Sequence, residues 1–429
     1  MLSGETTPPI SVIIPTYNRS RLIHGTLTAL AGQRAPADMF EVIVADDGST
    51  DDTRQTVESF RDRLHLRYHF QEDLGFRAAA ARNAGARLAR GGILAFVDSG
   101  ILPGPGFVAA HLAAHRRPGP ARAMLGYTYG FQPEHPTPGM AEILKTHTPE
   151  EVVRRYGALP EFHDNRHQLF AESGDNLSRT VLPWQLFWTC NCSVPADEFW
   201  AVGGFDEDFR SWGAEDTELG FRLSRHGLSI EVTRDGWAVD TPHPRRSTPD
   251  LGDNRSNMLT FLHKHPEPVL ELLWAWYSRH LPQLEDTRDW HVRLELPTLR
   301  RAANRVRNLD VTAELAQLRD IAAPGTRVAV FGCGGTLPDG FPPGELFDLD
   351  EKLLDRLPRD PARPTHHAVG IRTVLPDDAV DVVLITSRLA PLWRRWRAHL
   401  LAEARRIGRT VWSPLLGSDP AAVPAATPA

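Results

Sequence analysis

The sequence lacks several common features, and each absence narrows the kind of protein it encodes. Three cysteines in 429 residues are too few for a disulfide framework, so we expect a protein of the reducing cytoplasm. No apolar run reaches the length of about 18 residues that a transmembrane helix needs. The first ten residues also lack the basic and apolar regions of a signal peptide. We find no internal repeat.

Basic residues are in deficit as well. The formal net charge is −6, which argues against a nucleic-acid-binding protein, because such proteins usually present a basic surface. Cys190 and Cys192 stand close together, but no second Cys/His pair has zinc-finger spacing, so we interpret them as buried thiols. The remaining composition, with 41% hydrophobic and 24% charged residues, is ordinary for a globular chain of two or three domains.

Short apolar runs alternate with helical segments through the first hundred residues. This order predicts an α/β fold with a mostly parallel sheet and helices on both faces. Ser20 is expected to cap the first helix, and Thr50 or Asp51 the second. The expected strands are residues 10–14, 42–45, 66–70 and 93–97, and the third expected helix covers residues 78–89.

Polar residues stand at or just beyond the ends of the expected strands at 10–14, 42–45 and 93–97. Open α/β sheets bind their ligands at the carboxyl ends of the strands. Asp98 either simply ends a strand or faces a nucleotide diphosphate through a divalent cation. The DDGST stretch forms either an Asx-type turn with a helix cap or a nucleotide contact. The polar residues at these strand ends are Thr16, Tyr17, Asp46, Asp47 and Asp98, with Pro15 beside them.

The chain divides into four predicted parts. The first is a domain of residues 1–265, the second a helical linker at 266–320, the third a small Rossmann-like domain at 321–417, and the last a disordered tail at 418–429. Within the first domain we expect an insertion of helical pieces at about 130–182, which is a candidate lid. A strand at 186–194, a helix from Glu215, and short strands at 230–233 and 237–239 follow the insertion.

The C-terminal domain is open to two interpretations. A strand at 327–331 is followed by GCGG, and a second strand lies at 381–386, which resembles a fragment of a class I methyltransferase. Because GCGG lacks the full glycine spacing, we favour a degenerate domain used for packing or for homo-oligomer formation over a second enzyme. We expect the basic helix at 392–407 to dock its Trp and Leu side chains on the sheet rather than lie on an anionic membrane.

Five stretches, in this order and spacing, resemble family 2 glycosyltransferases of the GT-A fold. They are SVIIPTYNR (11–19), VADDGSTDDT (44–53), GFRAAAARNAGA (75–86), FVDSGILPGP (96–105) and VGGFDEDFRSWGAEDTELGFRL (202–223). The resemblance covers about residues 9–245. It implies a domain that binds a nucleotide sugar, here expected to be a UDP-sugar, and moves the sugar to an acceptor, usually with inversion.

The resemblance also implies roles on the donor side. In the family, residues at the strand ends hold the base and ribose, and a tryptophan face is a common sugar contact. The plainer alternatives are solvated helix residues for the polar side chains and core packing for the tryptophan. The implied base and ribose residues are Pro15, Thr16, Tyr17, Asp46 and Asp47, those near the pyrophosphate are Arg77, Arg82 and Asn83, and the sugar contact is Trp212.

A metal is implied in the same way. The Asp-x-Asp motif of the family holds Mg²⁺ or Mn²⁺, which neutralises the diphosphate leaving group. In this chain the motif reads Asp98-Ser99-Gly100, so the second carboxylate is missing, and we expect weak metal affinity without nucleotide. His243 is the candidate additional ligand, and a structural histidine is the alternative.

For the transfer itself, the resemblance implies that Asp216 is the general base and that Glu215 orients hydroxyl groups. The alternative is that both carboxylates only complement a helix dipole. A retaining transferase and a non-catalytic nucleotide-sugar-binding scaffold also stay open.

The acceptor is expected to be a soluble small molecule or a cytosolic glycan, because no membrane segment is present. The sequence is rich in Ala, Arg and Pro and poor in Lys, which points by analogy to bacterial antibiotic pathways, where such enzymes glucosylate aminocyclitols. Glucose from UDP-glucose is therefore the favoured donor.

Overall fold

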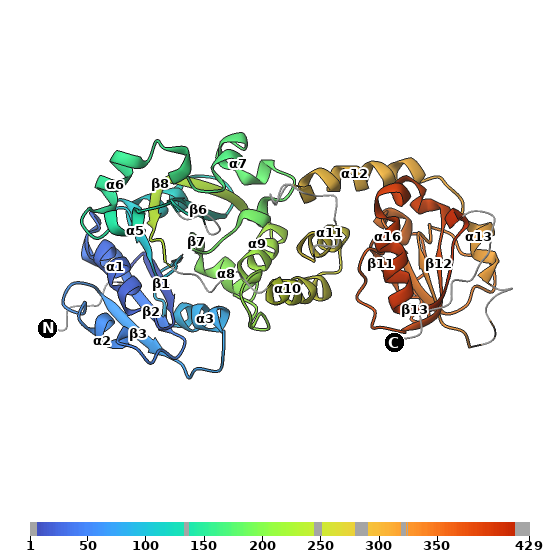
Figure 1. Ribbon diagram of the computed structural model, residues 1–429, viewed down its shortest axis with the longest axis horizontal. Coiled ribbons are helices and arrows are strands. Elements are labelled where there is room, and N and C mark those ends of the chain that lie inside the picture. The colour runs from blue at the N-terminus through green and yellow to red at the C-terminus, as the bar shows by residue number, and fades with distance from the viewer. Residues whose placement is uncertain are drawn as a thin grey trace. The chain divides into compact units, whose positions relative to one another are not determined.

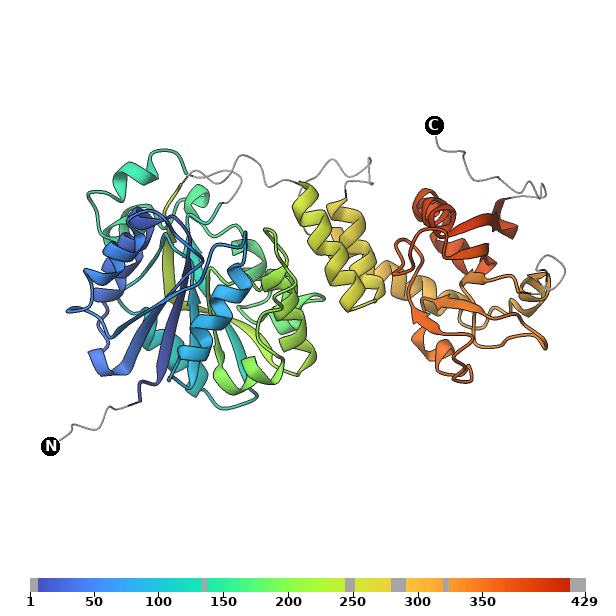
Figure 2. The same cartoon turned by 90° about the horizontal axis from the view of Figure 1, so that it is seen from below.

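The computed structural model describes residues 7–132, 137–243, 251–278, 291–318, 323 and 325–416. The chain forms two compact units, Met1–Asn257 and Met258–Ala429 (Figures 1 and 2). The boundary falls inside helix α10 (Leu251–Lys264), and the expected boundary at residue 265 lies just past the end of the same helix. The expected tail at 418–429 lies outside the described residues. No helix in the described ranges is long and apolar enough to cross a membrane.

An eight-stranded sheet forms the centre of the first unit, in the order β3-β2-β1-β4-β7-β6-β8-β5. The first four strands of this order are parallel, as expected. Strand β7 runs antiparallel to both of its neighbours, and β5 antiparallel to β8. The strands are β1 (Ile10–Thr16), β2 (Phe40–Asp46), β3 (Leu66–Phe70), β4 (Ile93–Val97), β5 (Ile101–Pro103), β6 (Arg122–Tyr129), β7 (Asn191–Pro195) and β8 (Ser229–Asp240).

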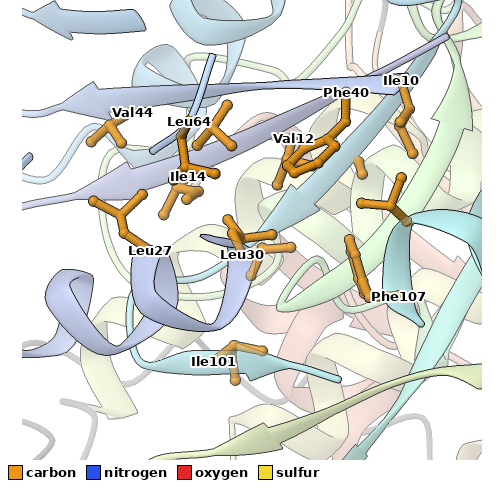
Figure 3. Packing of buried hydrophobic residues seen from close by; sticks show 14 of the residues in the cluster. Ile10, Val12, Ile14, Leu27, Leu30, Phe40, Val44, Leu64, Ile101 and Phe107 are labelled. Carbon is orange, nitrogen blue, oxygen red and sulfur yellow. The ribbon is translucent and has the colours of Figure 1, made fainter. Parts of the chain in front are cut away.

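The core lies between this sheet and the helices that follow its strands. Alternate residues of β1 point to one face, where they meet Leu27 and Leu30, which lie about one turn apart on α1 (Figure 3). Each such side chain contributes about 1.5–3 kcal/mol when it is fully buried. The helices of this part are α1 (Ser20–Ala31), α2 (Thr53–Glu58), α3 (Ala78–Leu88), α4 (Phe107–Arg116), α8 (Ala196–Ala201) and α9 (Glu215–Arg225), with a short 3₁₀ turn η1 (Ala37–Met39).

The predicted helix caps differ from the structure. Helix α1 is capped by Arg19 without a side-chain hydrogen bond, so the prediction for Ser20 is wrong. Instead, the Ser20 backbone N–H donates to Asp51 at 3.1 Å. Asp51 also accepts from the backbone N–H of Thr53, the first residue of α2, although the N-cap position belongs to Asp52. The loop between β2 and α2 is thus hydrogen-bonded to the first residue of α1.

The insertion consists of helical pieces, as expected, and it packs on the ends of β6 and β8. Its buried residues Met140, Val152 and Phe162 form a second core with Leu102 and Val239. The pieces are α5 (Met140–Ile143), α6 (Pro149–Tyr156), η2 (Pro160–Phe162), α7 (His167–Glu172), η3 (Leu177–Arg179) and η4 (Pro183–Leu186).

Two strand predictions beyond the insertion are wrong. The expected strand at 186–194 begins only at Asn191, because Leu186 ends a 3₁₀ turn. The two short strands at 230–233 and 237–239 are one strand, β8. Its register with β6 shifts so that residues 234–237 lie opposite Tyr127 alone. In the sequence, this bulge looks like a gap between two separate strands.

The second unit contains a five-stranded, all-parallel sheet in the order β11-β10-β9-β12-β13. Trp396 and Leu400 of α16 are buried while Arg394 and Arg397 are exposed, so this helix docks as expected. The strands are β9 (Val328–Phe331), β10 (Gly344–Asp348), β11 (Thr365–His367), β12 (Val380–Ile385) and β13 (Gly408–Trp412), and the helices are α11 (Pro268–Tyr277), α12 (His291–Val306), α13 (Thr312–Ala316), α15 (Glu351–Leu354) and α16 (Ala390–Ile407), with 3₁₀ turns η5 (Ser387–Leu389) and η6 (Pro414–Leu416).

The carboxyl edge of the second sheet is filled by the chain's own side chains. Arg388 and Asp348 are both fully buried and form a double contact at 2.8 and 3.1 Å. The backbone N–H of Gly334, in the GCGG loop, also donates to Asp348. The buried carboxylate of Glu271 accepts from the backbone N–H groups of residues 369–372. In a Rossmann-like nucleotide site the glycine-rich turn and an acidic residue face the cofactor, whereas here Gly334 and Asp348 bind each other.

Candidate active site

The carboxyl ends of the parallel strands bring the predicted residues to one edge of the first sheet. Thr16 at the end of β1 pairs in register with Asp46 at the end of β2. Strand β4 lies on the other side of β1, and Asp98 follows its last residue. Thr16, Asp46 and Asp98 therefore lie along the same edge, as the strand order predicts.

Asp46 is fully buried and already bonded to the protein. One carboxylate oxygen accepts from the backbone N–H groups of Gly48 and Ser49, at 3.1 and 2.7 Å. The other accepts from the Tyr68 hydroxyl at 2.7 Å. This is the Asx-type turn that the DDGST stretch predicts as one of its alternatives.

Asp47 connects this turn to the start of α3. Its carboxylate accepts from the Gln71 amide and from the backbone N–H of Arg77. Burial raises the pKa of Asp47, while the bond from Gln71 lowers it. Beside this corner, the hydroxyl of the half-exposed Tyr17 donates to Asp73 at 2.8 Å. Sequence reasoning missed Gln71, although it directly follows β3 and the rule that selected Asp98 would have found it.

A charge cluster forms at the centre of the edge. Arg82, almost completely buried, donates to Asp98 at 2.9 Å and to Glu215 at 3.1 Å. The Asp98 side chain is 40% exposed, so one face of the cluster is open. In the described part of the chain, Nε of Arg82 and Oε2 of Glu215 are buried without a hydrogen-bond partner. Such groups are costly to leave unsatisfied, which marks them as candidates for ligand contact.

Asp216 completes the cluster. Burial raises the pKa of its carboxyl to about 7, and the negative charge of Glu215 adds to this effect while Arg82 opposes it. The Asp216 carboxylate accepts a hydrogen bond from the backbone N–H of Thr217 at 2.7 Å. A carboxyl group that titrates near neutral pH suits proton transfer.

The loop before α9 holds both carboxylates at a helix start. Gly213 and Ala214 have φ values of +100° and +73°, and for alanine this left-handed conformation costs about 1–2 kcal/mol. Helix α9 begins at Glu215 without a side-chain cap. Trp212, in the same loop, is 47% exposed, so it is available to a ligand rather than packed in the core.

His243 lies beyond β8, on the same edge, but is engaged by Arg19. Its Nε2 faces an Arg19 guanidinium nitrogen at 2.9 Å, and its Nδ1 faces the Thr241 carbonyl at 2.9 Å. Because a guanidinium only donates, Nε2 accepts and Nδ1 carries the proton. No group of three or more His, Cys, Asp or Glu side chains that could hold a metal occurs within the described residues.

Asn83 is directed away from the charge cluster. Its amide exchanges hydrogen bonds with the backbone of Phe205 and donates to Glu207. These contacts fix the turn that follows α8. These neighbouring residues therefore have different roles: Arg82 binds in the charge cluster, and Asn83 holds the turn after α8.

Sequence reasoning also missed a buried ion pair in the insertion. Arg166 and Asp164 are both fully buried and contact each other at 2.8 Å. The Arg166 guanidinium lies 4.9 Å from the centre of the Trp188 ring, and, against the effect of burial, the negative charges of Asp164 and Asp216 help to raise its pKa. The pair anchors the insertion beside the cluster. The sequence carries no local signal for it.

Comparisons with known proteins match this chain to glycosyltransferases. The family model "Glycosyl transferase family 2" matches residues 11–170, and the model "N-terminal domain of galactosyltransferase" matches residues 175–243. The validoxylamine A glucosyltransferase of Streptomyces hygroscopicus subsp. limoneus is 43% identical over 97% of this chain and 93% of its own. The uncharacterized glycosyltransferase YfnE of Bacillus subtilis (strain 168) is 33% identical over 59% of this chain and 70% of its own.

Among solved structures, the mannosyltransferase PcManGT from Pyrobaculum calidifontis in complex with GDP-Man and Mn²⁺ matches with a TM-score of 0.44. It is 19% identical and covers 69% of this chain and 80% of its own.

The sheet, its carboxyl edge and the long match to curated transferases define the class: this is a glycosyltransferase with an α/β, GT-A-like fold and a second, all-parallel sheet. The chain belongs to glycosyltransferase family 2.

Proposed function

We propose that this chain is an inverting glucosyltransferase that moves glucose from UDP-glucose to a hydroxyl of a small-molecule acceptor of the aminocyclitol type. The choice of sugar and acceptor rests on similarity to the validoxylamine A glucosyltransferase along nearly the whole of both chains. The observation that carries the chemistry is the cluster of Asp98, Arg82, Glu215 and Asp216 at the carboxyl edge of the first sheet.

Asp216 is the proposed general base. It takes the proton of the acceptor hydroxyl as that oxygen attacks the anomeric carbon of glucose. The new carbon–oxygen bond forms on one face while the bond to the diphosphate breaks on the other, so the configuration inverts and UDP leaves. The raised pKa of Asp216 matches this role, because a base works best when its pKa lies near the working pH.

Glu215 is the proposed anchor for a sugar hydroxyl. Its Oε1 is bound by Arg82, whereas its Oε2 is buried without a partner in the described part of the chain. A hydroxyl that donates to Oε2 would satisfy it and would fix the orientation of the sugar.

The charge balance of the cluster favours a divalent cation. Asp98, Glu215 and Asp216 surround a single arginine, Arg82, so negative charge is in excess before a diphosphate arrives. Mg²⁺ or Mn²⁺ held by Asp98 would neutralise the leaving group. His243 fits as a further ligand only if Arg19 releases Nε2, the same nitrogen that it now contacts.

The donor and the stereochemistry are tested together. We would incubate the purified protein with Mg²⁺, validoxylamine A and a panel of UDP-sugars, and measure UDP release. We expect the fastest release with UDP-glucose, and NMR should show a β-glucoside formed from the α-linked donor. An α-glucoside would indicate a retaining enzyme, and donor binding without turnover across the panel would indicate a scaffold.

The base assignment is tested by Asp216→Asn. We expect turnover to fall by about 10²-fold or more while the dissociation constant for UDP-glucose stays unchanged, because the amide cannot accept the proton. Asp235→Asn is the matched control, since Asp235 is exposed at the bulge of β8. Normal turnover in a folded Asp216→Asn protein would refute the assignment.

A further inference from the structure

The loop of Ser211, Trp212 and Gly213 controls where the two carboxylates of α9 lie. Gly213 and the following Ala214 are in the left-handed region, a conformation that persists only where surrounding groups hold it. Helix α9 starts directly afterwards and has no side-chain cap of its own. The position of Glu215 and Asp216 therefore depends on whatever fixes this loop.

Asn257 of α10 fixes it. The Asn257 amide N–H₂ donates to the Ser211 carbonyl at 2.9 Å and to the Gly213 carbonyl at 2.6 Å. Its carbonyl oxygen accepts from the Ser211 hydroxyl at 2.9 Å. The side chain is 4% exposed. One buried amide thus holds the loop on both sides of Trp212 and uses both its donor and its acceptor groups.

Asn257 lies beyond both of the family models that match this chain. The second family model ends at residue 243, and Asn257 is 46 residues from Ser211 in the chain. Its helix also continues from the first unit into the second. The contact nevertheless reaches the loop that carries the exposed Trp212.

We propose that Asn257 is a positioning residue for glycosyl transfer. It holds the loop of Ser211, Trp212 and Gly213, and through it sets the place of Trp212 and of the Asp216 carboxylate relative to the acceptor. This inference rests on the proposed role of Asp216. A displacement of about 1 Å at a reacting group costs up to about 10²-fold in rate, so a loop released from Asn257 loses alignment before it loses fold.

Two substitutions test the inference. Asn257→Asp keeps the shape and still accepts from Ser211, but it cannot donate to the two carbonyl groups, and Asn257→Ala removes all three bonds. For both we expect kcat to fall about 10- to 100-fold, with KM raised for both substrates, because Trp212 and Glu215 move together with Asp216. The acidic limb of the pH–rate profile should shift, because the surroundings of Asp216 change.

Met258→Ala is the matched control. Met258 is the next residue of α10 and is 4% exposed, so its truncation weakens core packing without removing a bond to the loop. We expect a lower melting temperature with kcat unchanged.

Three outcomes separate this inference from the proposed function. Wild-type kcat in both Asn257 variants, beside an inactive Asp216→Asn, overturns the positioning role and leaves the proposed function standing. A loss of rate that only follows the loss of folded protein, as in Met258→Ala, also overturns it. Normal turnover in Asp216→Asn overturns the base assignment on which the inference rests, and the inference falls with it, whereas the proposed function itself is tested by the panel of UDP-sugars.

Discussion

Each unit carries an aspartate and an arginine at the carboxyl edge of its sheet, yet the two pairs differ in what is left open. Each carboxylate oxygen of Asp348 accepts two hydrogen bonds, one of them from Arg388. The side chains of Asp348 and Arg388 are completely buried. Asp98 receives one bond from Arg82, and its side chain is 40% exposed. The Asp348–Arg388 pair is therefore closed to solvent, whereas the Asp98–Arg82 pair is open to it.

This difference shows that strand topology places polar groups but does not by itself make a site. The second sheet is all-parallel and has glycines after β9, as a nucleotide site requires. Asp348 and Arg388 are bonded to each other, and Glu271 accepts from the backbone donors that follow β11, although Nε of Arg372 in that loop is buried without a partner among the described residues. In the first unit, buried atoms of Arg82 and Glu215 lack partners within the described residues. Such unfilled groups are what a substrate can use.

The largest expected effect comes from removing the open aspartate. Asp98→Ala should lower turnover by about 10³-fold or more, about 4 kcal/mol of transition-state stabilisation, because the proposed cation that would neutralise the diphosphate loses its fixed carboxylate. Its melting temperature should change little, since the side chain is partly exposed. UDP release and a thermal melt measure both.

The same mechanism predicts that excess EDTA abolishes activity and that Mg²⁺ or Mn²⁺ restores it. Full turnover under chelation would mean that Arg77 and Arg82 neutralise the leaving group without a metal.

Disrupting the closed pair of Asp348 and Arg388 should have the opposite effect, lowering the stability of the second unit rather than the rate of turnover. Arg388→Ala leaves Asp348 buried and unpaired, so we expect the free energy of unfolding of the second unit to fall by about 3 kcal/mol. Arg394→Ala, at an exposed position of the neighbouring helix α16, should change it by less than about 0.5 kcal/mol. Urea unfolding of both variants gives the comparison. Tight, stoichiometric binding of S-adenosylmethionine to the wild type in calorimetry would show that this edge is open after all.

The smallest expected effect is the pH dependence of turnover. The proposed base Asp216 can accept a proton only when it is deprotonated, and its pKa is raised to about 7. The rate should therefore be level above that pH and fall about tenfold for each pH unit below it. The residual rate of Asp216→Asn serves as the control, because it should lack this limb. A wild-type rate that is flat down to pH 5 would place the base elsewhere.

Local patterns were enough to predict the first half of the fold and the edge where the site lies. The runs that became β1 and β4 are apolar, of strand length, and followed by polar residues. Asp98 was therefore placed by its position after a strand, and the Glu215 helix by its acidic start. These predictions depend only on neighbours in sequence, which the sequence displays directly.

The rest depends on contacts between distant residues. Arg82 and Glu215 are 133 residues apart, and no local pattern announces their pairing. The expected strand at 186–194 was wrong in its first half because apolar residues there pack as a 3₁₀ turn and beneath an arginine, with Trp188 against the Arg166 cation. Strand β8 was divided wrongly because its bulge carries the charged residues Arg234 and Asp235.

The backbone at Gly100 makes the departure from the Asp-x-Asp motif hard to reverse. Two of the four glycine codons become aspartate codons by one base change, so the genetic code alone is a small obstacle to the second carboxylate of the Asp-x-Asp motif. However, Gly100 has a φ of +101°, and a Cβ there would lie 3.3 Å from Leu22, so any side chain is strained. Its backbone N–H is also held by Thr26. A Gly100→Asp change would therefore need further changes in the turn and in the packing of α1 before it could supply the second carboxylate of the motif.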